Sequence, residues 1–521
     1  MTDQGIVPPE TSMLRRRRMR RRMALATVAV VLAAAGVWGV VTVSGACGSL
    51  DSGVQDIDGT CVGVNDGSYV FHPELADVLG RIEEENARVR DEGGYVSVAL
   101  LDPLTPTETS ALPLTSVRNR LEGAYTAQRR VNTSHVAGDP NPRIQLLLAN
   151  QGDTDDQWTH VLDRLRELSV AEEHPLLAVV GLGVSTARTR EQAEDLADSD
   201  IPMVGAVLTA DDLEHDAISG LIKTSPSNRH YVAALRHHMR IEGLDTAIMV
   251  RDSNSEEGID LYTRSLEEEF EEQMEKVISR YRTQQFTGKS ASGDSTPSLF
   301  AGVQANICAS AADGNRAVLY AGREIDLGDL LRSLRNRTCR ETPLTLLTAG
   351  LELGKVLADP DLDLRAAKLT ILNAATVDPL GWSGEEPGTP VGYPDFHGAF
   401  VRHFPANHLL DGGAIMVHDA LLTAARAIRL AAPNGAASYL TPERVRGQLL
   451  NLNGEFVVTG ASGTLEFSDG RKDEGTGVPG GKPIPVLRYP SLTDRERASE
   501  RVGDLCHIVA GPKLVACGPA G

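Results

Sequence analysis

Two short polar segments, each placed after an apolar run, carry residue types that suit a small anionic ligand. Ser185 and Thr186 follow the apolar run at 176–181, and Thr209 closes a second apolar run at 202–209. Serine and threonine hydroxyls beside the free amides of a helix start can bind a carboxylate or a similar group. The sequence therefore offers a binding site here, provided that the fold brings the two segments together.

The predicted secondary structure around these two segments brings them together. Both apolar runs resemble strands buried on both faces, and a polar helix is expected over 187–198. Strand, helix and strand in this order form a parallel βαβ crossover, and ligands bind beyond the carboxyl ends of such strands. A simpler interpretation also stands, in which Ser185 and Thr186 are helix caps and Thr209 is an ordinary strand-end residue.

The sequence lacks the patterns of several other kinds of site. Gly181-Leu182-Gly183 has no third glycine for a dinucleotide fingerprint, and 350–355 is one residue short of a phosphate loop. Neither a Gly-x-Ser-x-Gly elbow nor a His-Glu-x-x-His pair occurs. We therefore expect no enzymatic activity, no metal and no cofactor.

The charge distribution separates the first residues from the rest. The chain has 521 residues, a net charge of −20 and 4% aromatic residues, which argues against nucleic-acid binding. Residues 1–22 carry seven arginines, and 23–43 carry no charge. This pattern predicts a transmembrane helix at 23–43 with a cytoplasmic N-terminus and an extracytoplasmic body. Cleavage or lipidation at 44–47 is the alternative.

The cysteines support an oxidising location for the body. All six follow the predicted span and fall into three local pairs. An even number in such a compartment favours disulfides, whereas a zinc site requires tighter clustering of ligands. The predicted disulfides are Cys47 with Cys61, Cys308 with Cys339, and Cys506 with Cys517.

Strand-like and helix-like segments alternate along the body in two successive series. The first series includes strands at 94–101, 143–149 and 176–181, and the second begins with a helix at 228–241. Such alternation is typical of an α/β protein with two doubly wound, parallel-sheet lobes.

Five blocks give the body a resemblance to the type I periplasmic-binding fold, specifically to the branched-chain amino-acid-binding (leucine-binding-like) substrate-binding proteins of ABC transporters. In chain order the blocks are 96–105 with Gly123, 179–186 with 201–213, 222–227, 417–421, and 460–469. The block at 222–227 resembles the family's crossover between lobes. The block at 417–421 resembles its Tyr-Asp-Ala helix, and 460–469 resembles its closing segment, with Gly463 and Phe467 in place.

The resemblance implies two doubly wound lobes joined by a three-strand hinge. The expected parts are a basic cytoplasmic segment (1–22), a transmembrane helix (23–43), a stalk and lead-in helix (44–93), a first lobe (94–222 and 378–458), a second lobe (223–377 and 459–490) and a disulfide-closed tail (491–521).

The resemblance also implies where a ligand is bound, since the family holds the carboxylate and ammonium groups of its ligand with two cleft loops. The ligand-binding residues expected on this basis are Gly183, Ser185, Thr186, Val207, Leu208, Thr209, Asp252 and Glu257. Glu257 stands where the family has a tyrosine, and this departure favours a cationic or sugar-like ligand. Glu352 corresponds to an acidic residue often found on the fourth strand of the second lobe.

These observations predict a membrane-anchored, extracytoplasmic solute-binding protein that captures a small, amino-acid-like ligand for an ABC importer. The expected partners are that small molecule, an ABC permease and the cell membrane, which a single helix spans. The alternative is a ligand-sensing or scaffold ectodomain that docks to a membrane or signalling partner. An arginine-rich helical anchor is less usual for importer components, which favours that alternative.

Overall fold

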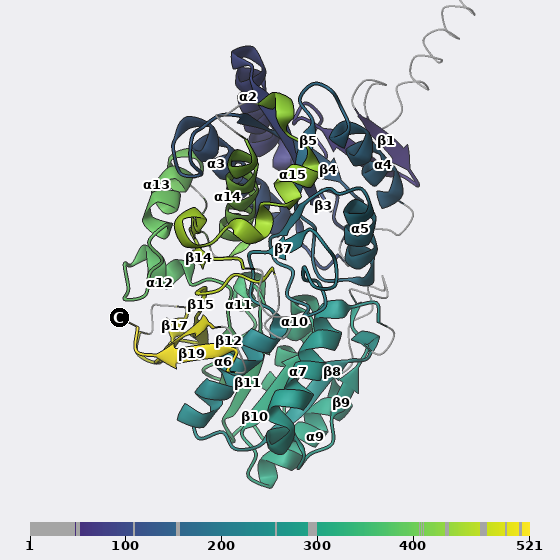
Figure 1. The fold of residues 1–521 in the computed structure, drawn as a ribbon. Helices are drawn as coiled ribbons and strands as arrows, with labels where there is room; N and C mark the ends of the chain where they lie inside the picture. Colours follow the sequence, from purple (N-terminus) through teal and green to yellow (C-terminus); the bar gives the residue numbers. More distant parts are fainter. Residues whose placement is uncertain are drawn as a thin grey trace, which may run out of the picture. The chain divides into compact units, whose positions relative to one another are not determined.

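A computed structural model of the chain is shown in Figure 1. It describes residues 47, 53–107, 110–152, 157–255, 258–289, 300–405, 407, 409, 411–432, 437–468, 477–494, 498–509 and 513–520. The chain divides into an N-terminal unit that ends at Cys61 and a second unit from Val62 onward. The N-terminal unit contains β1 (Val54–Ile57) and a disulfide between Cys47 and Cys61.

The segment expected to cross the membrane, 23–43, lies outside the described residues. Within the described residues, none of the helices has the length and apolar character that a membrane span requires.

The first sheet of the larger unit has a parallel centre and an antiparallel edge. Its order is β2-β4-β3-β5-β6-β7, with β2 antiparallel to β4 and the other neighbours parallel. The strands are β2 (Thr60–Asn65), β3 (Tyr95–Asp102), β4 (Arg143–Asn150), β5 (Leu176–Gly181), β6 (Met203–Gly205) and β7 (Leu221–Lys223). The long central strands are buried along nearly their whole length, as their continuous apolar runs predict.

Helices cover both faces of this sheet (Figure 1). One face carries α2 (Ala76–Glu92), α3 (Leu114–Thr133), α14 (Gly413–Ala431) and α15 (Pro442–Arg446), and the other carries α4 (Trp158–Ser169) and α5 (Ala187–Asp198). Gly123 is required for the close approach of α3 to α14, because a Cβ there would lie 2.1 Å from the Ala414 carbonyl oxygen. The later segment of the chain thus returns to complete the first lobe. Two further helices precede α14 in this returning segment, namely α12 (Pro379–Ser383) and α13 (Tyr393–His403).

The first lobe begins earlier in the chain than the sequence analysis expected. Residues 63–65 of the expected stalk pair with β4, and the expected lead-in helix is α2, which packs on the same strand. Asn86 of α2 explains the attachment, because its side chain bonds both the amide and the carbonyl of Leu146 at 2.9 and 2.7 Å. From residue 62 the chain is therefore part of the lobe rather than a separate stalk.

The second sheet has the order β17-β16-β12-β11-β10-β8-β9. The neighbours from β12 to β9 are parallel, whereas β16 and β17 form an antiparallel edge. The strands are β8 (Ala247–Asp252), β9 (Gln284–Phe286), β10 (Ala317–Ala321), β11 (Leu344–Ala349), β12 (Leu369–Ala374), β16 (Val486–Tyr489) and β17 (Glu500–Arg501). Its helices are α6 (Asn228–Ile241), α7 (Leu261–Ile278), α9 (Ala301–Ala312), α10 (Glu324–Arg335) and α11 (Gly354–Leu357).

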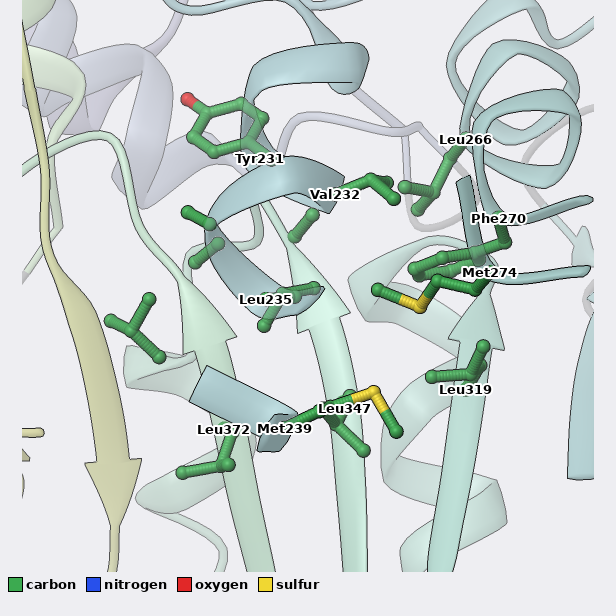
Figure 2. Close-up of a cluster of buried hydrophobic side chains, with 14 of the residues drawn as sticks. Tyr231, Val232, Leu235, Met239, Leu266, Phe270, Met274, Leu319, Leu347 and Leu372 are labelled. Carbon is green, nitrogen blue, oxygen red and sulfur yellow. The ribbon is translucent and has the colours of Figure 1, made fainter. Parts of the chain in front are cut away.

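Apolar side chains fill both faces of this second sheet. Figure 2 shows one face, where side chains of α6 and α7 pack onto Leu319, Leu347 and Leu372 of three adjacent strands. The alternate strand residues, such as Val318 and Ile371, face the opposite side and pack with α9 and α10. Since successive strand residues point to opposite faces, a continuous apolar run provides two cores at once.

The chain crosses between the two sheets three times, and the crossing segments are bonded to each other. The Lys223 amide donates to the Gly477 carbonyl at 2.9 Å, and the Ala375 amide donates to the Pro485 carbonyl at 2.8 Å. The last crossing also contains β13 (Val458–Gly460), β14 (Gly463–Leu465) and β15 (Pro483–Ile484). This arrangement forms the hinge of three strands that the sequence analysis predicted.

A buried polar network holds the last crossing to α14. The Asp419 carboxylate accepts hydrogen bonds from the two backbone amides at 461–462, at 2.7 and 2.8 Å, and from Ser462 Oγ at 2.5 Å. His418 Nδ1 lies 2.8 Å from the same carboxylate, and Lys482 Nζ donates to Ser462 Oγ. Burial lowers the pKa of Lys482 to about 7. The network explains why the closing block begins with glycine, because a Cβ at Gly460 would lie 2.5 Å from Asp419 Oδ2.

A second buried network lies at the first crossing. Lys223, which is fully buried, donates to the Ala210 carbonyl at 2.8 Å and lies 3.2 Å from Glu214. Arg229 at the start of α6 pairs with Glu214 at 2.7 Å and with Asp211 at 3.2 Å. Each charge of this cluster therefore has an opposite charge beside it.

All three disulfides join the cysteines that the sequence paired. Besides Cys47–Cys61, they are Cys308–Cys339 and Cys506–Cys517, and no free cysteine remains in the described part of the chain. Cys506–Cys517 links β18 (Leu505–Ile508) to β19 (Val515–Gly518). The expected tail is thus not separate, because its β17 extends the second sheet.

Candidate functional site

A cavity of about 120 Å³ lies between the two lobes, at the carboxyl ends of their parallel strands. This is the position where ligands bind in open α/β sheets. Its polar lining includes Ser116, Arg120, Ser185, Thr209 and Asp411 from the first lobe, and Tyr262, Arg323, Glu324, Glu352 and Asn373 from the second.

The structure brings Ser185 and Thr209 together, as the βαβ unit predicted. The Ser185 hydroxyl accepts hydrogen bonds from the Thr209 amide at 3.0 Å and from the Ala210 amide at 3.2 Å. Ser185 is only 1% exposed, so it orders the loop that follows β6 and is not an exposed helix cap. Thr209 also lines the cavity, and its hydroxyl has no hydrogen-bond partner among the described residues.

The second strand of the unit is shorter than the sequence suggested. A strand was expected over 202–209, but β6 covers only Met203–Gly205. Beyond Gly205, side-chain hydroxyls replace the neighbouring strand as hydrogen-bond partners of the backbone carbonyls. Thr224 donates to the Ala206 carbonyl at 3.2 Å, and Ser225 donates to the Leu208 carbonyl at 2.5 Å. Because residues 206–210 leave the sheet, Val207 and Thr209 reach the cavity.

Three other expected residues of these loops do not line the cavity. Thr186 is the cap of α5 and accepts a hydrogen bond from the Thr189 amide at 3.2 Å. Gly183 donates its amide to Asp102 at 2.9 Å, and Leu208 is fully buried. These residues shape the two loops instead of facing the cavity.

The two residues expected after β8 also fall outside the cavity lining. Asp252 is fully buried, and its carboxylate accepts from the amides of Gly288 and Asn254 at 2.8 and 3.0 Å. It therefore anchors a loop. Glu257, which stands in the place of the family's tyrosine, lies outside the described residues.

Tyr262 supplies an aromatic wall that the sequence analysis did not identify. It lies five positions after Glu257, at the start of α7, and its hydroxyl donates to the Ala349 carbonyl at 2.6 Å. Its ring also lies beneath the Arg323 guanidinium, at 5.2 Å from the ring centroid. Tyr262 lies beyond Asp252 and Glu257, the two positions that the resemblance singled out after this strand.

Two buried arginines were also missed. Arg120 of α3 pairs with Asp102 at the end of β3, with Nη1 and Oδ1 3.0 Å apart. Arg323 precedes α10 and pairs with Asp260 at 2.5 Å, and it donates to the Ser185 carbonyl of the other lobe at 2.9 Å. Arg323 thus links the two walls of the cavity.

Three acidic side chains line the cavity, and two of them, Glu352 and Asp411, are far apart in sequence. Glu352 follows β11, as the resemblance implied, and Asp411 precedes α14. Burial raises the pKa of Glu352 to about 8, and the nearby Asp411 charge adds to the effect. Burial likewise raises the pKa of Asp411. Across the described residues, no group of three or more histidine, cysteine or acidic side chains is arranged to hold a metal ion.

Neither a protein-family model nor a curated protein matches the chain. Solved structures do match. A leucine complex of an ABC transporter substrate-binding protein from Desulfitobacterium hafniense has a TM-score of 0.54 and 15% identity, and covers 78% of this chain and 100% of its own. A leucine-binding protein from Thermotoga maritima has a TM-score of 0.51 and 12% identity, and covers 81% of this chain and 97% of its own.

A third match is the substrate-binding protein of a branched-chain amino-acid transporter from Streptococcus pneumoniae, bound to isoleucine. It has a TM-score of 0.53 and 11% identity, and covers 78% of this chain and 99% of its own. The chain therefore has the type I periplasmic-binding fold of ABC transporter substrate-binding proteins. The sequence resemblance is confirmed at the level of the fold.

Proposed function

We propose that this protein is an extracytoplasmic solute-binding protein that captures a small, amino-acid-like ligand between its two lobes for an ABC importer. The observation that carries the proposal is the cavity between the lobes, where Thr209 of one lobe and Glu352 of the other present polar groups. Proteins of this fold that were solved with leucine or isoleucine support an amino acid as the ligand.

The cavity offers complementary groups to the two ends of an amino acid. The Thr209 hydroxyl and the Nε of Arg120, which has no hydrogen-bond partner, are suited to the ligand carboxylate. The Glu352 carboxylate is suited to the ammonium group. Ser185 has a different role from the one expected, since its hydroxyl is already bonded to two amides and positions Thr209.

A ligand screen with two threonine variants tests the proposal. Amino acids are screened by thermal shift, and each hit is titrated by calorimetry. Thr209→Ala should weaken binding roughly ten- to a hundredfold, the value of a hydrogen bond to a charged group. Thr186→Ala is the matched control, because it removes a hydroxyl that caps α5 outside the cavity and should leave the affinity unchanged. Equal affinity in both variants would place the ligand elsewhere.

We further propose that the N-terminal segment anchors the protein in the cell membrane as a single-pass helix. The support is the uncharged run at 23–43 after seven arginines. Mass analysis of the mature protein tests this. An intact N-terminus in the membrane fraction supports the anchor, whereas a chain that begins at Cys47 indicates cleavage or lipidation.

A sensor or scaffold ectodomain is the second candidate, and one observation favours it. Arg323 pairs with Asp260 in its own lobe and donates to the Ser185 carbonyl of the other lobe, so it bonds the two lobes directly. A domain held in this way can present one fixed surface to a membrane partner. Isolation of the protein from its own membrane separates the candidates: co-purification with a permease and ATPase supports the importer, and co-purification with a kinase supports the sensor.

A further inference from the structure

Glu352 and Asp411 face the cavity from opposite lobes, and neither forms an ion pair with a described residue. The Glu352 carboxylate accepts one hydrogen bond, from Ser116 Oγ at 3.3 Å. Asp411 accepts from the Gly413 amide at 3.0 Å and from the Asn119 side chain. All of these donors are neutral, so they do not balance the charge of either carboxylate.

Each of the two arginines of the cavity pairs with a carboxylate that lies outside the cavity. Arg120 pairs with Asp102, and Arg323 pairs with Asp260, and neither of these aspartates lines the cavity. Asp102 and Asp260, which lie outside the cavity, thus balance the charges of the two arginines. Glu352 and Asp411 feel the Arg120 charge but form no ion pair with it, because Asp102 already holds that guanidinium.

Asn373 contributes a further polar group to the cavity. Its side chain lines the cavity and is 1% exposed, and its Nδ2 donates to the Leu351 carbonyl at 2.9 Å. Its Oδ1 is buried without a hydrogen-bond partner. A buried acceptor without a hydrogen-bond partner costs free energy. A ligand that brings an N–H or O–H donor to this oxygen is therefore favoured.

We propose that the ligand is an amino acid with a cationic side chain, whose two cationic groups are shared between Glu352 and Asp411. The inference rests on the proposed function and narrows its ligand class. A neutral aliphatic amino acid has one ammonium group and can satisfy one of the two carboxylates. A second ammonium or guanidinium group satisfies the other and supplies a donor for Asn373. The apolar lining residues, among them Val207 and Leu351, suit the methylene stem that joins the two charges.

Titration of the full-length protein with matched amino acids tests the inference. Lysine, ornithine and arginine are compared with norleucine, which has the stem of lysine without its ammonium group, and with leucine. At least one of the three cationic amino acids should bind about tenfold or more tightly than norleucine. If norleucine or leucine binds equally well, the inference fails and the proposed function stands. If no amino acid binds, the proposed function fails as well, and binding of a neutral sugar in its place would show that the two acids act as uncharged groups.

Variants assign the second cation to one residue. Asp411→Asn keeps an acceptor for the Gly413 amide and should reduce lysine affinity about tenfold or more, while norleucine affinity stays the same. Glu341→Gln is the control, since Glu341 is 92% exposed and pairs with Lys368 on the surface. A melting temperature near that of the wild type confirms folding. An unchanged preference for lysine over norleucine in Asp411→Asn would overturn the assignment.

Discussion

The hinge network around Asp419 and the cavity around Glu352 are both buried and both charged, and they differ in how the charge is balanced. Both carboxylate oxygens of Asp419 are hydrogen-bonded, by two backbone amides, the Ser462 hydroxyl and the His418 ring. Although burial alone raises the pKa of Asp419, the hydrogen bonds, with His418 first, hold it below its ordinary value. Burial raises the pKa of Glu352, and its single hydrogen bond does not reverse the effect.

This difference separates a structural role from a binding role. A fully bonded buried carboxylate stabilises one arrangement of the chain and has no capacity for a further partner. A desolvated carboxylate with few partners is less stable in the free protein and gains most when a cation arrives. The hinge network therefore stabilises the junction between the lobes, whereas the proposed ligand site keeps a buried carboxylate with few partners.

The largest expected effect is the loss of stability in Asp419→Ala. The change leaves two amides and the Ser462 hydroxyl without their acceptor in a buried site and removes the negative charge near Lys482, at a cost of about 3–5 kcal/mol. Thermal and urea unfolding measure the loss. Asp411→Asn in the cavity is the comparison, and it should show no such loss. A melting temperature of Asp419→Ala equal to that of the wild type would contradict the structural role of the network.

Ser185→Ala should have the next largest effect on stability. It leaves the amides of Thr209 and Ala210 without an acceptor, which costs about 1–3 kcal/mol. Thr209→Ala should cost less, because its hydroxyl bonds no described residue, and should act on ligand affinity instead. Urea unfolding compares the free energies of unfolding of the two variants. Equal values would contradict the assignment of loop ordering to Ser185 and of the proposed ligand contact to Thr209.

Ligand binding should depend on pH through Glu352. Asp411, Arg120, Glu324 and the Ser116 hydroxyl face this carboxyl group, and its pKa in the free protein is about 8. A cationic ligand displaces the proton that Glu352 carries below pH 8, so affinity for lysine should rise by up to about tenfold per pH unit from pH 6 to 8 and then level off. Calorimetry in buffers of different ionisation enthalpy measures the released proton. Glu352→Gln should bind weakly with no such release, and proton release by this variant would assign the titration to another group.

The smallest expected effect is a gain in stability when the Glu352 charge is removed by Glu352→Gln. The pKa of Glu352 is raised in the folded protein, so the stability contributed by its protonated form is present below its ordinary pKa and is lost as pH rises from about 4.5 to about 8. At pH 8.5 the ligand-free Glu352→Gln protein should therefore melt about 2 °C or more above the wild type, and at pH 4.5 the two should agree. Differential scanning calorimetry at both pH values tests this, and a variant that melts lower at pH 8.5 would show that the charge is already well compensated.

Local patterns were sufficient for much of the fold and for one side of the site. The continuous apolar runs predicted the central strands, and the order of strand, helix and strand predicted that Ser185 and Thr209 lie together. The hydrogen bonds that shorten β6 were not predictable, because they depend on Thr224 and Ser225 folding back over the loop. Tyr262 was missed because nothing local in the sequence indicates that the first turn of α7 reaches the cavity.

The sequence by itself determined the alternation of strands and helices, the pairing of the six cysteines and the sheet edge where Ser185 and Thr209 come together. These features arise from short-range periodicity and spacing. Only the tertiary structure decided which charges are paired. Arg120 and Asp102 meet across the end of a sheet, and Glu352 and Asp411 meet across two lobes. The free energy of a buried charge depends on its spatial neighbours and its distance from water, and residue type and sequence spacing encode neither of these quantities.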